Sequence, residues 1–129
     1  MHYFNDGGLG SHKIDFPIEI TTFSDVPAGS GLGSSSSFAV GLMNALYALK
    51  GQLVTKYTLA ESAARIEIEI LKRTMGKQDH YAAAYGDLNV LTFHANENVT
   101  VEPVFYSSEV HQKIASNLLL LSSLRLLRQ

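Results

Sequence analysis

A glycine- and serine-rich stretch at residues 25–38, DVPAGSGLGSSSSF, has residue types that suit phosphate binding. Glycines let the backbone approach a phosphate closely, and serine hydroxyls can donate to phosphate or coordinate Mg²⁺. A helical apolar pattern follows, and the first N–H groups of a helix lack internal partners and favour negative charge. The stretch therefore predicts a polyphosphate-binding loop. A surface turn with a serine cap is the alternative interpretation.

Two familiar phosphate loops do not match this stretch. A Walker A loop ends in Gly-Lys-Ser/Thr, and no lysine lies between Asp25 and Met43. The dinucleotide pattern G-x-G-x-x-G fails because Ser34 stands three residues after Gly31. The glycine loop of protein kinases requires the same spacing and fails with it.

Phosphoryl transfer also needs a group that can take the proton of the attacking hydroxyl, and carboxylates downstream of the loop can do so. Asp79 follows the glycine break at Gly76 and is expected at the start of a helix, where a simple N-cap is the alternative. Glu67 and Glu69 lie on the preceding segment. Successive residues of a helix are rotated by about 100° around its axis, so residues two positions apart lie some 200° apart. Only one of these glutamates can therefore face the loop.

The string from Pro27 to Ser36, PAGSGLGSSS, resembles the second signature motif of the GHMP kinases, Pro-x-Gly/Ser-x-Gly-Leu-Gly-Ser-Ser. The resemblance implies that the loop binds ATP phosphates and that Ser35 supplies a hydroxyl at Mg²⁺. It implies that Asp79, in the pattern Gly-x-x-Asp, is the base for the acceptor hydroxyl. Glu67, twelve residues before Asp79, is the implied metal ligand, with Glu69 as its competitor. The implied nucleotide-binding residues are Pro27, Gly29, Ser30, Gly31, Leu32, Gly33, Ser34, Ser35 and Ser36.

The string GKQDHYAAAYG at residues 76–86 is similar to the heptose phosphate kinase subgroup of that family. The resemblance implies an ATP- and Mg²⁺-dependent sugar kinase, or its nucleotide-binding fragment, with a heptose phosphate as acceptor. The family's N-terminal motif and its third, glycine-rich motif are not found in this sequence. The alternative is therefore an inactive truncated remnant that acts as a nucleotide-binding or protein-interaction module.

The elements that must position these residues are predicted from hydrophobic periodicity. Alternation predicts a strand over 16–24, and apolar residues three and four apart predict helices near 35–50 and 58–73. Thr58 and Glu61 form a capping-box pattern at the second helix. A short helix near 78–85, a hairpin at 87–105 and a helix near 107–117 complete an α+β fold. The resemblance implies a ribosomal-protein-S5-like N-terminal domain of a GHMP kinase over residues 1–129, without the C-terminal domain.

Composition excludes several other classes of protein. The 129 residues are 46% hydrophobic and carry a formal net charge of −2, which predicts one globular domain without the basic excess of nucleic-acid-binding proteins. The absence of cysteine excludes a disulfide scaffold. The apolar run at residues 118–121 is far shorter than the about 20 residues that span a bilayer. We expect a cytoplasmic protein without nucleic-acid or membrane partners, which forms homo-oligomers through exposed apolar surface.

Overall fold

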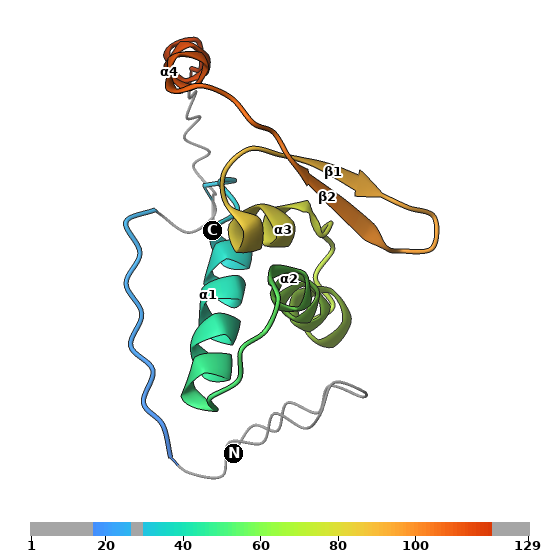
Figure 1. Ribbon diagram of the computed structural model, residues 1–129. Helices are drawn as coiled ribbons and strands as arrows, with labels where there is room; N and C mark the ends of the chain where they lie inside the picture. The colour runs from blue at the N-terminus through green and yellow to red at the C-terminus, as the bar shows by residue number, and fades with distance from the viewer. Residues whose placement is uncertain (1–16, 27–29, 120–129) are drawn as a thin grey trace, which may run out of the picture.

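The computed structural model describes residues 17–26 and 30–119. Within this part of the chain, four α-helices, one π-helical segment and one β-hairpin form the α+β architecture that the sequence predicts (Figure 1). In chain order the elements are α1 (Ser34–Leu49), α2 (Lys56–Arg65), η1 (Ile66–Ile70), α3 (Gln78–Tyr85), β1 (Asn89–Phe93), β2 (Val99–Pro103) and α4 (Ser108–Ser116). None of the helices in the described ranges is long and apolar enough to cross a membrane.

Helices α1, α2 and α3 pack against one another and form the main core. Residues at positions i, i+3 and i+7 of α1 share one face, which here consists of Val40, Met43 and Tyr47. This face packs against Leu59 and Ala63 of α2. Small side chains let the helices approach closely, so this core fixes where the first turn of α1 lies relative to α2 and α3.

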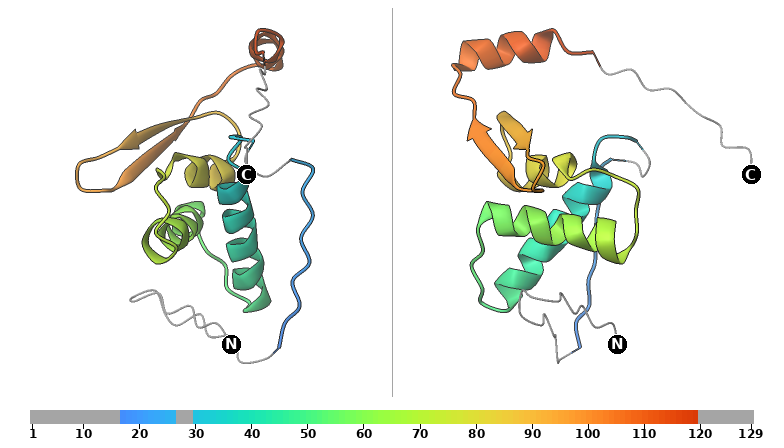
Figure 2. Two further views of the ribbon diagram at one scale, coloured as in Figure 1. Left: turned by 180° about the vertical axis from the view of Figure 1, so that it is seen from behind. Right: turned by 90° about the vertical axis from the view of Figure 1, so that its right-hand side faces the viewer.

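The hairpin packs against α3 and forms a second, smaller core. Strands β1 and β2 are antiparallel, with a register from Asn89 opposite Pro103 to Phe93 opposite Val99. Tyr81 of α3 is fully buried in this core, with its ring edge-to-face with that of Phe93 at 6.3 Å. Figure 2 shows α4 standing apart from the three-helix core, and none of its residues is buried.

The strand predicted over 16–24 is wrong for residues 17–24. These residues form no ladder, and Ile18, Ile20 and Phe23 are exposed. An extended segment becomes a strand only when a neighbouring strand accepts its backbone hydrogen bonds, and β1 pairs only with β2 among the described elements. The helices predicted near 35–50, 78–85 and 107–117 and the predicted hairpin are confirmed.

The helix predicted near 58–73 begins earlier and ends differently. Its N-cap is Thr55, whose Oγ1 accepts a hydrogen bond from the backbone N of Thr58 at 3.1 Å. The capping box predicted from Thr58 is therefore wrong, because Lys56 and Tyr57 already belong to the helix. The last turn widens into the π-helical segment η1, and the chain leaves the helix after Ile70.

Replacing Thr55 by alanine is expected to lower the free energy of unfolding by about 1 kcal/mol, because the N–H of Thr58 loses its cap. Thr58→Ala is the matched control, since it keeps the capping oxygen of Thr55 and removes the same two groups, a methyl and a hydroxyl, the latter lying 2.9 Å from that oxygen. Urea unfolding of both variants measures the difference. Equal losses in the two variants would contradict the assignment of the cap.

Candidate functional site

The glycine loop leads directly into the first turn of α1. Gly31 and Gly33 have φ angles of 74° and 69°, in the left-handed region that favours glycine. Gly33 is the N-cap of α1, and no side chain of the described residues caps this helix end. The N–H groups that begin the helix therefore lack an intrahelical partner and suit an anion.

The structure places most of the predicted loop residues at this helix end. Ser34, Ser35 and Ser36 form the first turn of α1, and Ser30 and Leu32 lie just before it with exposed side chains. Ser36 is buried at 1% exposure, so its side chain points into the protein rather than toward the mouth of the loop. Pro27 and Gly29 lie outside the described residues.

Asp79 lies against the loop. It is in the first turn of α3, whose N-cap is Lys77, so the interpretation of Asp79 as the N-cap is wrong. A Cβ placed on Gly33 would lie 3.4 Å from both Cγ and Oδ2 of Asp79. The packing of α3 against α1 thus brings the Asp79 carboxylate directly beside the glycine loop.

Glu67 is the buried carboxylate at this site. Ser35, 32 residues away in sequence, donates its hydroxyl to Oε1 of Glu67, and Nη1 of Arg73 lies 2.8 Å from the same oxygen. The other oxygen, Oε2, accepts a hydrogen bond from Nε2 of His80 at 2.8 Å. The structure therefore brings together Ser35 and Glu67, the two predicted metal ligands.

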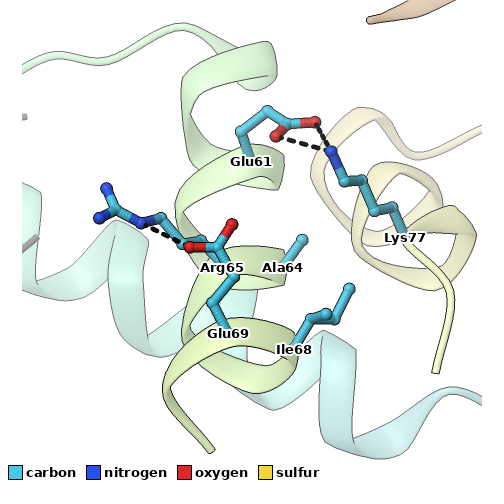
Figure 3. Close-up of a pocket in the computed structure, with 6 residues that line it drawn as sticks. All are labelled: Glu61, Ala64, Arg65, Ile68, Glu69 and Lys77. Atoms are coloured by element: carbon cyan, nitrogen blue, oxygen red, sulfur yellow. Dashed lines mark hydrogen bonds and ion pairs between the residues drawn. The ribbon is translucent and has the colours of Figure 1, made fainter. Parts of the chain in front are cut away.

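Glu69 points elsewhere. Its side chain is 64% exposed and pairs with Arg65 at 3.2 Å, one helical turn earlier (Figure 3). Lys77 pairs with Glu61 at 3.2 Å, so its charge is directed toward α2 rather than toward the loop (Figure 3). A depression of about 120 Å³ lies among these side chains and contains neither the loop nor Asp79. Its lining residues are Glu61, Ala64, Arg65, Ile68, Glu69 and Lys77.

The contacts of Glu67 keep it ionised. Burial opposes the charged form, but the hydrogen bonds from Ser35 and His80 outweigh it, together with the positive charges of His80 and Arg73. The pKa of Glu67 therefore lies below its ordinary value of 4.5. At neutral pH the site presents a buried anion.

Glu67 is expected to make the free energy of unfolding fall at acid pH. Because its pKa is lower in the folded chain, its contribution is complete above pH 4.5 and is lost as the pH falls through the folded value. The groups that face it are Ser35, Arg73 and His80. Urea unfolding at a series of pH values should show a steeper acid loss of stability for wild type than for Glu67→Gln. Parallel pH profiles would contradict this prediction.

The oxygen donors at this site fit Mg²⁺. Magnesium prefers hydroxyl, carboxylate and water oxygens, and in kinase sites the protein supplies only one or two of them. Ser35 and Glu67 are such a pair. Within the described ranges no group of three or more histidine, cysteine or acidic side chains could hold a metal ion by itself. A metal held here would therefore take its other ligands from water and from phosphate.

Two side chains of the cluster were not selected from the sequence. His80 is fully buried, and Arg73 follows the π-helical turn. The adjacency of His80 to Asp79 suggests acid–base chemistry, but the histidine contacts Glu67 instead. No spacing rule links Arg73 to Ser35, 38 residues earlier, so only the fold reveals their contact.

Comparison with known proteins assigns the chain to a family. The sequence pattern described as GHMP kinases N terminal domain matches residues 3–87, more than half of the chain. The chain belongs to the GHMP kinase family. A solved structure, a D-glycero-D-manno-heptose 1-phosphate kinase from Bacteriodes thetaiotaomicron, superposes with a TM-score of 0.70 at 35% identity. That match covers 73% of this chain and 31% of the solved chain.

Curated relatives agree with this assignment. The D-glycero-alpha-D-manno-heptose 7-phosphate kinase of Campylobacter jejuni is 39% identical over 92 residues, which are 71% of this chain and 27% of the relative. The galactokinase of Mycobacterium tuberculosis is 30% identical over 86 residues, which are 67% of this chain and 24% of the relative. This GHMP kinase chain thus matches about a quarter to a third of the length of these three proteins.

Proposed function

We propose that this chain binds Mg²⁺–ATP and serves as the nucleotide-binding part of a sugar kinase. The observation that carries the proposal is the convergence of Ser35, Glu67 and Asp79 at the glycine-led N-terminus of α1. These three residues come from three different helical segments. A hydroxyl, a buried carboxylate and a second carboxylate beside one anion-binding helix end are the groups that phosphoryl transfer uses.

The glycine loop would hold the phosphates. Gly31 and Gly33 turn the backbone through left-handed conformations, and the N–H groups of the first turn of α1 would donate to phosphate oxygens. The helix dipole adds to this attraction. Ser35 and Glu67 would hold Mg²⁺ at the same end of the helix, where the metal would neutralise charge on the transferred phosphoryl group.

Asp79 would accept the proton of the attacking hydroxyl. Its carboxylate lies against Gly33, so an acceptor bound beside the loop would reach both the base and the terminal phosphate of ATP. The two heptose phosphate kinases among the relatives support a heptose phosphate as the acceptor. Since the chain matches 27% and 31% of those proteins, we propose that further kinase residues complete the acceptor site.

Calorimetric titration with Mg²⁺–ATP tests the proposal. Ser35→Ala removes the hydroxyl from the site, and Ser37→Ala is its control, because Ser37 is exposed two positions further along α1. Gly31→Val forces a β-branched residue into a φ of 74°. Gly41→Val is its control, because Gly41 lies within α1 with open space around it.

We expect both site variants to weaken binding by about tenfold or more, and both controls to bind like wild type. Absence of binding by folded wild type would overturn the proposal. Binding of Mg²⁺–ATP without turnover of heptose phosphates would favour the alternative, a nucleotide-binding module that has lost catalysis.

A further inference from the structure

Arg73 stands between the two oxygens that the proposed function assigns to Mg²⁺. Its Nη1 donates to Oε1 of Glu67 at 2.8 Å and also to Oγ of Ser35. Ser35 in turn donates its hydroxyl to the same Oε1. One cationic nitrogen thus bridges the hydroxyl and the carboxylate oxygen. A divalent cation held by these two atoms at about 2.0–2.1 Å would need that position.

The end of the π-helical turn places Arg73 there. The backbone N of Leu71 donates to Ile66 O at 2.9 Å, and Lys72 then adopts a φ of 53°. This left-handed residue reverses the chain, so that the backbone N of Arg73 donates to Glu67 O at 2.9 Å. A left-handed non-glycine residue is uncommon and costs free energy. Its consequence here is that the Arg73 side chain returns over Glu67.

Among the groups of this cluster, only Arg73 can withdraw at low cost. The side chain of Glu67 is 4% exposed, and His80 holds its Oε2 from a fully buried position. Arg73 is 52% exposed, so its guanidinium can move into water. Removing one partner from a buried ion pair is strongly destabilising, so withdrawal of Arg73 from Oε1 of Glu67 favours a replacement cation at that oxygen.

We propose that Arg73 is a placeholder cation that competes with the divalent metal for Ser35 and Glu67. This inference rests on the proposed function of those two residues as metal ligands. Arg73 keeps the buried carboxylate paired and aimed at the loop when no metal is bound. Metal binding then requires Arg73 to leave Glu67, and this requirement lowers the apparent affinity for the metal.

Binding of Mn²⁺ alone to the full chain, followed by the electron paramagnetic resonance signal of the free ion, tests this inference. Arg73→Gln and Arg73→Met both remove the competing charge, and Met keeps most of the stem. Lys72→Gln is the matched control, because it removes one positive charge from the neighbouring residue and keeps both contacts of Arg73. We expect the Arg73 variants to bind Mn²⁺ about tenfold tighter than wild type and Lys72→Gln to change affinity less than about threefold.

Further results separate the inference from the function on which it rests. In Arg73→Gln combined with Glu67→Gln, the gain in Mn²⁺ affinity should disappear. Wild-type binding that depends on Glu67 but is unchanged or weakened by Arg73→Gln would overturn the placeholder role and leave the metal site intact. Equal gains in Mn²⁺ affinity from Lys72→Gln and Arg73→Gln would mean that only the net charge of the chain matters. That result would also overturn the placeholder role. Absence of Mn²⁺ binding in every folded variant would overturn the placeholder role. It would leave the proposed Mg²⁺–ATP site to the calorimetric titration, because ATP phosphates supply further ligands there.

Discussion

In a kinase whose acceptor site is complete, replacing Asp79 by asparagine is expected to lower turnover of a heptose phosphate by about 10²- to 10⁴-fold, the usual contribution of a general base. Asparagine has nearly the same shape, so it can keep the contact with Gly33, but it cannot accept a proton at neutral pH. The affinity for Mg²⁺–ATP should change by less than about threefold, because the proposed function assigns the phosphates to backbone N–H groups of the loop.

Release of ADP in the presence of heptose phosphates measures this effect, and calorimetry measures nucleotide affinity beside it. Asp87→Asn is the matched control, because Asp87 follows the other end of α3 and contacts Tyr106 instead of the loop. Turnover by Asp79→Asn at the wild-type rate would remove Asp79 from the proposed mechanism. If Asp79→Asn loses both turnover and nucleotide binding, Asp79 is a nucleotide-binding residue rather than a base.

The second large effect is expected from Glu67→Gln, which should weaken the Mg²⁺-dependent part of ATP binding by about tenfold or more. The glutamine amide can keep hydrogen bonds with Ser35 and His80, so the local packing should survive. The variant loses the negative charge that would hold the metal, and Arg73 loses its ionic partner. Binding of ATP measured with and without Mg²⁺ separates the metal effect from the effect on phosphate binding.

Glu69→Gln is the control for this prediction, since it removes the same charge two residues along the same segment. Glu69 is exposed and contacts Arg65, so its loss should leave the Mg²⁺ dependence unchanged. A stronger effect from Glu69→Gln than from Glu67→Gln would reassign the metal ligand. No effect from either would mean that Ser35 and the phosphates hold the metal without a glutamate.

Local signals predicted the helices that flank the site. A short helix near 78–85 is predicted between the glycine breaks at Gly76 and Gly86, and the structure has α3 over Gln78–Tyr85. Helix α1 also lies where its periodicity predicts. Its apolar residues are spread around the axis, however, so periodicity did not identify the buried face. Phe38 and Leu49 are half exposed, while Val40, Met43 and Tyr47 are buried against α2.

Contacts between residues far apart in the chain could not be predicted from the sequence. The segment at 17–24 alternates like a strand, but alternation cannot supply a partner, and the described residues offer none. Helical geometry showed that Glu67 and Glu69 face different directions, but not which one faces the loop. That choice was left to spacing within the family, and in the structure Glu67 is the glutamate beside Ser35.

The sequence by itself determined which chemical groups are present, namely a glycine- and serine-rich loop ahead of a helix, Asp79 at an expected helix start, and Glu67 and Glu69 on the preceding segment. These follow from residue type and local backbone preference, which act over a few positions. Only the tertiary structure decided that Ser35, Glu67, Arg73 and His80 meet in one cluster, with Asp79 beside the loop. The physical reason is that α1, α2 and α3 bury their faces against one another, and this packing joins positions as far apart in sequence as Gly33 and Asp79.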